Sequence, residues 1–374
     1  MNSNSIGRHF KMTTFGESHG KCVGLVIDGC PAGLQLSESD IQPDLDRRKP
    51  AQSSVTTARK EPDNVEILSG IFDGFTTGAP LCLIVWNKDA DSKTYLNLVD
   101  TPRPGHSDYP ALIKYNHFND WRGGGRFSAR NTVPYVIAGS IAKKILKESL
   151  GTDIAAYTVE IGGVSSKTPS WDDILSTRYS NSVRCPDQLA AKEMENRILA
   201  AKREGDSVGG IIECVSQPLP VGLGEPIFSS LDSDLSRLLF AIPAVKGVEF
   251  GSGFKSSKLT GSQNNDLFVF DDGKVITKTN NSGGILGGLS TGMPLITRLA
   301  FKPPSSIAKR QKTVNLDTKK LVDLRVMGRH DPCVLPRAVP IVEATVAIVL
   351  VDQALVGGFI SHDLFMKRNE DRRK

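Results

Sequence analysis

The chain has 374 residues, of which 39% are hydrophobic and 23% charged, as expected for a soluble globular protein with one large domain or two ordinary ones. The net charge of +5 is modest, and the arginines occur in short clusters. This argues against a general nucleic-acid-binding protein and favours small anionic ligands. The six cysteines are scattered without a C-x-x-C pair, which argues against a zinc ribbon or a thioredoxin-type motif and indicates buried reduced thiols.

Strands and helices are predicted in mixed order along the chain. Ser37 and Asp40 form a capping box that would open a helix ending near residue 48. Other helices are predicted at 132–150, 186–204, 231–242 and 339–355, and strands at 10–15, 22–28, 65–71, 81–86, 207–215 and 294–301. Because no Ser/Gly-rich linker divides the chain, we predict one α+β domain over residues 1–360 and a charged tail at 361–374. The long connections at 87–120, 251–266 and 302–320 are expected to be functional loops.

Neither a secretory signal nor a membrane span is predicted. The first ten residues are polar, and the apolar segment 338–355 contains Pro340, Glu343 and Asp352. Asp352 would therefore be either solvated near the helix end or buried with a partner, because an unpaired buried carboxylate is costly. The expected location is the cytoplasm.

Residues 121–130, with the sequence W-R-G-G-G-R-F-S-A-R, combine three glycines with three arginines. Glycine allows positive φ angles and a close approach of the backbone to a ligand. Arginine supplies a planar fork of donors that matches phosphate and carboxylate. The segment is therefore predicted to form an anion-binding loop.

Two histidines lie in loops where they could transfer protons. His19 follows Ser18 in a G-x-S-x-G pattern, but the next segment is predicted to be a strand, so the helix that a hydrolase nucleophile elbow requires is missing. His106 is flanked by Arg103 and Asp108, whose charges would shift its pKa in opposite directions. Each histidine could equally be a turn or surface residue without a catalytic role.

Basic and glycine-rich segments recur along the chain. Arg48 closes the first predicted helix, where it could simply complement the helix C-terminus. Segments 282–288 and 302–306 are suited to a phosphorylated cofactor, although the first is not a dinucleotide fingerprint. Segment 330–333, H-D-P-C, lacks a matching pair of ligands, so no metal site is expected.

In combination, these motifs resemble chorismate synthase. The resemblance extends from about residue 7 to about residue 356, and its motifs occur in the order of the family: 16–20, 44–48, 103–108, 123–130, 283–288, 302–306 and 328–333. It implies a single-domain sandwich of sheets and helices, usually tetrameric. It also implies a lyase that eliminates phosphate from 5-enolpyruvylshikimate-3-phosphate to give chorismate, the last step of the shikimate pathway towards aromatic amino acids.

The resemblance also implies roles for particular residues. His19 would protonate the leaving phosphate, and His106 would keep reduced FMN correctly protonated, with Ser18, Ser128 and Asp352 supporting proton transfer. The matching FMN-binding positions are Arg126, Phe127, Ser128, Ala244, Gly287, Lys302, Pro303, Pro304, Ser305, Ser306 and Arg329. The substrate's phosphate and two carboxylates would be met by Arg48, Arg59, Arg130 and Arg337.

Three positions depart from the pattern of the family. Many members carry serine at Phe127 and glutamate at Asn131, and some have arginine at Ser54, a position linked to NADPH use by members that reduce their own flavin. We therefore expect an external flavin reductase. A serine hydrolase built on Ser18 and a non-enzymatic polyanion-binding protein are the alternatives that remain.

Overall fold

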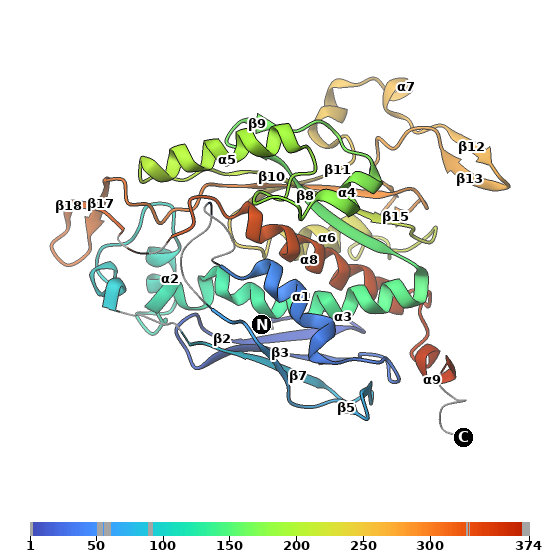
Figure 1. The fold of residues 1–374 in the computed structure, drawn as a ribbon, viewed down its shortest axis with the longest axis horizontal. Helices are drawn as coiled ribbons and strands as arrows, with labels where there is room; N and C mark the ends of the chain where they lie inside the picture. Colours follow the sequence, from blue (N-terminus) through green and yellow to red (C-terminus); the bar gives the residue numbers. More distant parts are fainter. Residues whose placement is uncertain are drawn as a thin grey trace.

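The fold consists of two five-stranded antiparallel sheets with helices between them (Figure 1). The computed structural model describes residues 3–50, 55, 61–88, 93–326, 328 and 330–368. The first sheet has the strand order β1 (Ser5–Ile6), β2 (Lys11–Gly16), β3 (Cys22–Asp28), β7 (Leu81–Trp86), β4 (Val65–Ile67). The second has the order β11 (Val245–Phe250), β16 (Leu295–Phe301), β10 (Gly210–Gln217), β8 (Asp153–Ile161), β9 (Val164–Ser165). This arrangement confirms the predicted α+β sandwich.

The layer between the sheets is built from α1 (Glu38–Arg48), α3 (Val133–Leu150) and α8 (Leu335–Val356) (Figure 1). Helices α3 and α8 pack closely because Gly139 has no side chain: a Cβ added there would lie 2.2 Å from the Cβ of Ala344. Helix α8 is long and apolar enough to cross a membrane, but 94% of its most apolar window is buried inside the fold. It is therefore the core helix of the sandwich, as expected for a helix that is apolar on all sides.

Smaller elements surround this core. The other helices are α2 (Asp108–Lys114), α4 (Trp171–Thr177), α5 (Gln188–Arg203), α6 (Leu231–Leu239), α7 (Gly261–Asn264) and α9 (Leu364–Arg368). Two-stranded hairpins are β5 (Ile71–Phe72) with β6 (Phe75–Thr76), β12 (Phe268–Asp271) with β13 (Lys274–Thr277), β14 (Ile285–Leu286) with β15 (Leu289–Ser290), and β17 (Gln311–Asn315) with β18 (Lys320–Leu324). Single 3₁₀ segments are η1 (Lys93–Leu98), η2 (Arg122–Phe127), η3 (Ala129–Thr132) and η4 (Gly253–Lys258).

Local sequence signals placed several boundaries correctly. The Ser37 capping box opens α1, and Gly151 ends α3 in the left-handed conformation with a φ of 72°. The segment after Ser18 and His19 is strand β3, so the structure confirms that no nucleophile elbow is present.

Other expectations need correction. Strand β8, nine residues long, was not predicted, and the predicted helix at 231–242 ends at Leu239. The predicted long loops contain α2, α7 and β17. Within the predicted tail 361–374, α9 is helical and Phe365 is only 2% exposed, because it packs on the body of the fold beside Gly33. Residues 369–374 lie outside the described part of the chain.

Candidate functional site

The glycine run of η2 lies against both candidate histidines. A Cβ added to Gly123 would lie 2.3 Å from Cδ2 and 2.4 Å from Nε2 of His19, and a Cβ at Gly124 would lie 3.5 Å from Cε1 of His106. Gly123, Gly124 and Gly125 all have positive φ angles, between 50° and 83°. A backbone of this shape can touch two imidazoles only without side chains. The structure therefore brings His19 and His106, 87 residues apart by their numbers, to one loop.

His19 sits in a tightly packed turn between β2 and β3. It is 8% exposed, and its ring meets Tyr95 of η1 edge-on, with 5.3 Å between the ring centroids. Ser18 is 1% exposed; its backbone N–H donates to the carbonyl of Gly125, and its Oγ would lie 2.9 Å from a Cβ at Gly123. Packing from three segments therefore fixes the imidazole and leaves it little freedom to reorient.

His106 is held by a carboxylate that is itself paired with arginine. Its Nδ1 lies 2.6 Å from Oδ1 of Asp108, and Arg103 donates to both oxygens of that carboxylate at 2.7 Å. Although burial opposes ionisation, the hydrogen bonds from Arg103 and His106 hold the pKa of Asp108 well below its usual range. With its proton on Nδ1 the imidazole donates to this carboxylate and keeps Nε2 as an acceptor; Arg103 NH2 lies 3.1 Å from the same Nδ1.

The loop of His106 also contacts the Lys-Pro-Pro-Ser-Ser segment. Lys302 Nζ donates a hydrogen bond to the carbonyl of Gly105, and Arg103 donates to Ser306 Oγ at 2.9 Å. Burial and the neighbouring Lys246 lower the pKa of Lys302. Among the described residues no carboxylate is paired with Lys302, whose hydrogen-bond partner is the carbonyl of Gly105, so a phosphate would be a favourable neighbour.

We expect Asp108→Asn to destabilise the protein by roughly 1–3 kcal/mol at pH 7, since charge-assisted hydrogen bonds to Arg103 are lost. The folded-state pKa of Asp108 is depressed, so this stabilisation is complete above the unfolded value of 3.8 and falls as the pH drops towards the folded value. Urea unfolding of both proteins should therefore show a difference at pH 7 that shrinks below about pH 4. A difference that stays constant down to pH 2.5 would contradict this account of the carboxylate.

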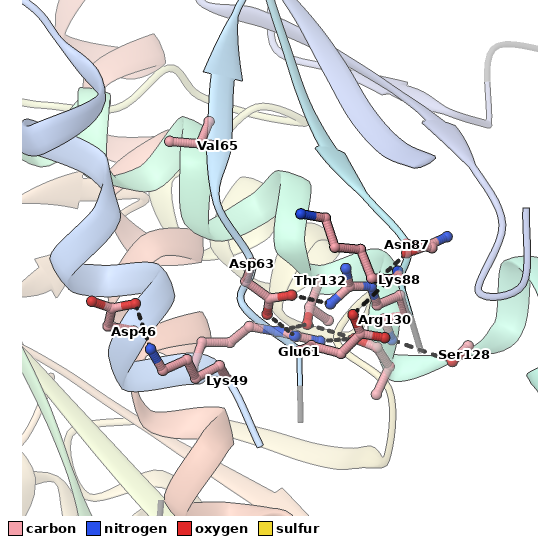
Figure 2. A network of polar contacts seen from close by, with 12 residues as sticks. Asp46, Lys49, Glu61, Asp63, Val65, Asn87, Lys88, Ser128, Arg130 and Thr132 are labelled. Carbon is pink, nitrogen blue, oxygen red and sulfur yellow. Dashed lines mark hydrogen bonds and ion pairs between the residues drawn. The ribbon is translucent and has the colours of Figure 1, made fainter. Parts of the chain in front are cut away.

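A second group of charges surrounds the buried carboxylate of Asp63 (Figure 2). Oδ1 of Asp63 accepts from NH1 of Arg130, and Oδ2 accepts from NH1 of Arg48 at 3.2 Å. Asn87 joins this group to the His19 turn: its Oδ1 accepts from Arg130 Nε at 2.9 Å, and its Nδ2 donates to the carbonyls of residues 17 and 20. The arginines predicted to bind substrate therefore lie next to the turn that carries a candidate acid.

Arg337 joins the same cluster from the first turns of α8. Its Nε donates to the carbonyl of Arg48 at 3.1 Å, and its NH1 pairs with Asp331. Burial, and then the charge of Arg337, lower the pKa of Arg48 to about 9, so the group remains a cation at neutral pH. An added anion would relieve this repulsion.

The residues after the glycine run point in different directions. The guanidinium of Arg126 is engaged by β2, donating to the carbonyl of Gly16 at 2.9 Å and to Thr14 Oγ1 at 2.9 Å. Phe127 is 40% exposed, and its ring centroid lies 6.4 Å from that of Tyr115. Ser128 Oγ accepts from the backbone N–H of Arg130 at 3.3 Å. Arg126 thus orients the loop, while Phe127 remains accessible.

Asp352 does not lie with the other proposed catalytic residues. It is about four turns, or about 22 Å, further along α8 than Arg337. Its carboxylate accepts from the backbone N–H groups of Arg8, His9 and Phe10 at 2.7–3.0 Å, so it anchors the segment between β1 and β2. Of the two possibilities weighed from sequence, the structure shows the buried and partnered one.

The structure also separates two of the predicted cofactor positions. Ala244 lies beside Lys302, whose N–H donates to its carbonyl at 2.9 Å. Gly287 lies at the exposed turn of the β14–β15 hairpin, and the nearby Gly284 contacts Pro294 just before the start of β16. Lys302 comes directly after the end of β16, and the length of this strand separates the two ends by about 20 Å. Within one chain, Gly287 is therefore distant from the Lys302 segment. Arg59, Arg329 and Ser54 lie outside the described residues.

Sequence reasoning missed four residues that organise the site: the carboxylates of Asp63 and Asp331, the amide of Asn87 and the aromatic ring of Tyr95. Asp331 was considered only within two short motifs, the family motif at 328–333 and the candidate metal motif at 330–333, and was given no role of its own. In the described part of the chain no group of three or more metal-ligating side chains is present. Asp63 and Asn87 carry no local signal, since their partners are distant in sequence. Asp63 and Asn87 can be recognised as site residues only once their hydrogen bonds to Arg130 are known.

Together these features define an enzyme-type site for a small polyanion, with two histidines packed against one glycine loop and three arginines near the turn of His19. A family model described as "Chorismate synthase" matches residues 10–355. Proteins named chorismate synthase from Dehalococcoides mccartyi and Methanococcoides burtonii are 52% and 50% identical, covering 96% and 98% of this chain and 98% and 100% of their own lengths. A crystal structure of chorismate synthase superimposes with a TM-score of 0.76 at 30% identity, covering 98% of each chain. The chain belongs to the chorismate synthase family.

Proposed function

We infer that the protein is a lyase that converts 5-enolpyruvylshikimate-3-phosphate to chorismate and inorganic phosphate, the last step of the shikimate pathway. The observation that carries the inference is the meeting of His19, His106 and the arginine cluster, in a chain of this family. The substrate's phosphate and two carboxylates need several cations to offset their desolvation. Arg48, Arg130 and Arg337 supply three, only partly balanced by Asp63 and Asp331.

The donor chemistry near His106 fits a phosphorylated flavin. Lys302, Ser305 and Ser306 form a segment with a cation and hydroxyls, and it packs on the glycine of the His106 loop. These residues would hold reduced FMN, which supplies transient electron donation for expelling an allylic phosphate whose partner hydrogen is not acidic. The flavin requirement belongs to the family; the reduced state and the particular contacts are our proposal.

Different residues of the chain would then donate the proton, contact the flavin and bind the substrate. His19, held rigidly by Gly123 and Tyr95, donates a proton to the departing phosphate. His106 presents Nε2 towards the flavin, with Nδ1 fixed by Asp108. The arginines orient the substrate and neutralise charge as phosphate leaves. Ser18 lies against Gly123 and Ser128 against Gly124, and their hydroxyls would assist proton transfer.

Anaerobic turnover tests the proposal. We expect chorismate to form from 5-enolpyruvylshikimate-3-phosphate when reduced FMN is supplied, and none with NADPH and oxidised FMN alone. Chorismate formation without any flavin would refute the mechanism. Labelling of Ser18 by a serine-reactive phosphonate would revive a hydrolase, and steeply salt-dependent nucleic-acid binding would favour a polyanion-binding protein.

We further propose a cytoplasmic homotetramer that receives reduced flavin from an external reductase. Self-association is supported by the β12–β13 hairpin, which projects from the body (Figure 1). Phe268, Phe270 and Val275 lie on one face of it and are 61%, 84% and 52% exposed, with Phe270 paired to Val275. An isolated hairpin is marginally stable in water, and an apolar face of this kind is typical of an interface.

Phe270→Asp should weaken this assembly by at least tenfold, because a carboxylate would replace a large apolar contact. Sedimentation velocity over a concentration series would measure the change in dissociation constant. Leu321→Asp is the matched control, since Leu321 is 76% exposed on the separate β17–β18 hairpin. Equal sedimentation of Phe270→Asp and the control would contradict the role of the β12–β13 hairpin.

A further inference from the structure

We propose that Asp63 is a positioning residue, which holds Arg130 so that one edge of its guanidinium is presented to the anionic substrate. Asp63 carries no motif of its own and is not among the residues that the family resemblance pointed to. The proposal rests on the proposed function, because it assumes that Arg130 binds the substrate.

The carboxylate of Asp63 is in contact with two cations and shielded from water. The residue is 0% exposed, and its two oxygens are divided between Arg48 and Arg130 (Figure 2). A single negative charge between two guanidinium groups reduces their repulsion and sets the spacing between them. With Asp63 included, the three-residue group retains a net positive charge, so it still attracts an anion.

The two arginines differ in what remains free. All three nitrogens of Arg48 have acceptors: Thr132 Oγ1 at 3.3 Å, Asp63 at 3.2 Å and the carbonyl of Ala129 at 2.8 Å. Arg130 uses Nε for Asn87 and NH1 for Asp63, but its buried NH2 has no acceptor among the described residues. Since buried polar groups are nearly always paired, this NH2 points to an acceptor on the ligand.

The backbone conformation at Asp63 is held by hydrogen bonds that keep its carboxylate near Arg130. Its φ of 49° lies in the left-handed region, which aspartate tolerates better than most residues. Gln42 on α1 holds the segment on both sides, with Nε2 donating to the carbonyl of Asp63 and Oε1 accepting from the N–H of Val65, each at 3.2 Å. The carboxylate is thereby attached to the core helix layer, and through it so is Arg130.

The test measures equilibrium binding of 5-enolpyruvylshikimate-3-phosphate by calorimetry, without flavin, to wild type, Asp63→Asn, Arg130→Lys and the double variant. We expect Asp63→Asn to weaken binding at least tenfold, because the negative charge is lost and one of the two accepting oxygens becomes an NH2 donor that faces a guanidinium. In the Arg130→Lys background the same change should cost less than threefold, because residues that act as a unit are not additive. Asp63→Glu, which keeps the charge, should recover part of the affinity.

Asp44→Asn is the matched control, because Asp44 is a buried carboxylate on the same helix as Arg48 but pairs with Lys143, Ser140 and Arg47, and in the described part of the chain its hydrogen bonds and ion pairs reach neither Arg48 nor Arg130. It should lower the melting temperature without changing substrate affinity. Wild-type affinity in Asp63→Asn, or an equal loss with and without Arg130, would overturn the proposal. If Asp63→Asn does not fold, Asp63→Glu serves as the test. Wild-type substrate affinity in Asp63→Glu would overturn the proposal, whereas a loss of affinity that disappears in the Arg130→Lys background would support it.

Turnover by the wild-type enzyme is assayed separately, so a negative result in the binding experiment does not contradict the proposed lyase activity.

Discussion

Replacing His19 by alanine is expected to lower turnover by about 10³-fold while the flavin still binds. The physical reason is the loss of a positioned proton donor, a contribution that typically amounts to 10²–10⁴-fold. The imidazole lies 8% exposed beside Ser18, and the turn that carries it is hydrogen-bonded to Asn87, which also holds Arg130. A proton donated there would reach a group that the arginine is binding. Anaerobic rates with saturating reduced FMN would measure the effect.

The control for this variant is His362→Ala, which removes an exposed imidazole near the C-terminus of the described chain. It should leave turnover unchanged. Flavin binding, followed by fluorescence quenching, should be similar in both variants. Turnover of His19→Ala within threefold of wild type would contradict the assignment of the proton donor. An equal loss of flavin affinity and turnover would instead indicate a binding role for His19.

The second large effect is expected for Gly123→Ala, a change of a single methyl group. The added Cβ would lie 2.3–2.4 Å from the ring of His19, closer than atoms can approach, so the imidazole must move. A displacement of about 1 Å at a catalytic group can cost about 100-fold in rate. We therefore expect turnover to fall about 100-fold, together with a loss of stability of about 1–2 kcal/mol from the left-handed backbone at a φ of 57°.

Gly163→Ala separates these two contributions. Gly163 also has a positive φ, 89°, but a Cβ there meets nothing within 4 Å. The control should therefore show a similar loss in urea unfolding with normal turnover. If both variants lose turnover equally, backbone strain rather than displacement of His19 accounts for the result, and the proposed contact has no catalytic importance.

Residue patterns over short distances indicated much of the architecture. Capping at Ser37, the left-handed glycine at 151 and the apolar repeat of α8 are local, because each depends on hydrogen bonds or packing within a few residues. The positive φ angles of residues 123–125 are also a local property, because three consecutive glycines permit them. The motifs that resemble the family also pointed to both histidines and to Arg48 and Arg130, since each motif is a short continuous segment; Arg337 lies just beyond the last motif.

What remained undetermined depends on contacts between distant segments. Asp63 and Arg130 are 67 residues apart, and nothing near either one shows that a carboxylate will bridge two guanidiniums. The partners of Asp352, the N–H groups of residues 8–10, could not be predicted because they come from the other end of the chain. The sequence by itself therefore determined the family, the local elements and the candidate acids. Only the tertiary structure decided which charges are paired and which donor of Arg130 stays free, because side-chain pairing across the core follows from packing rather than from local pattern.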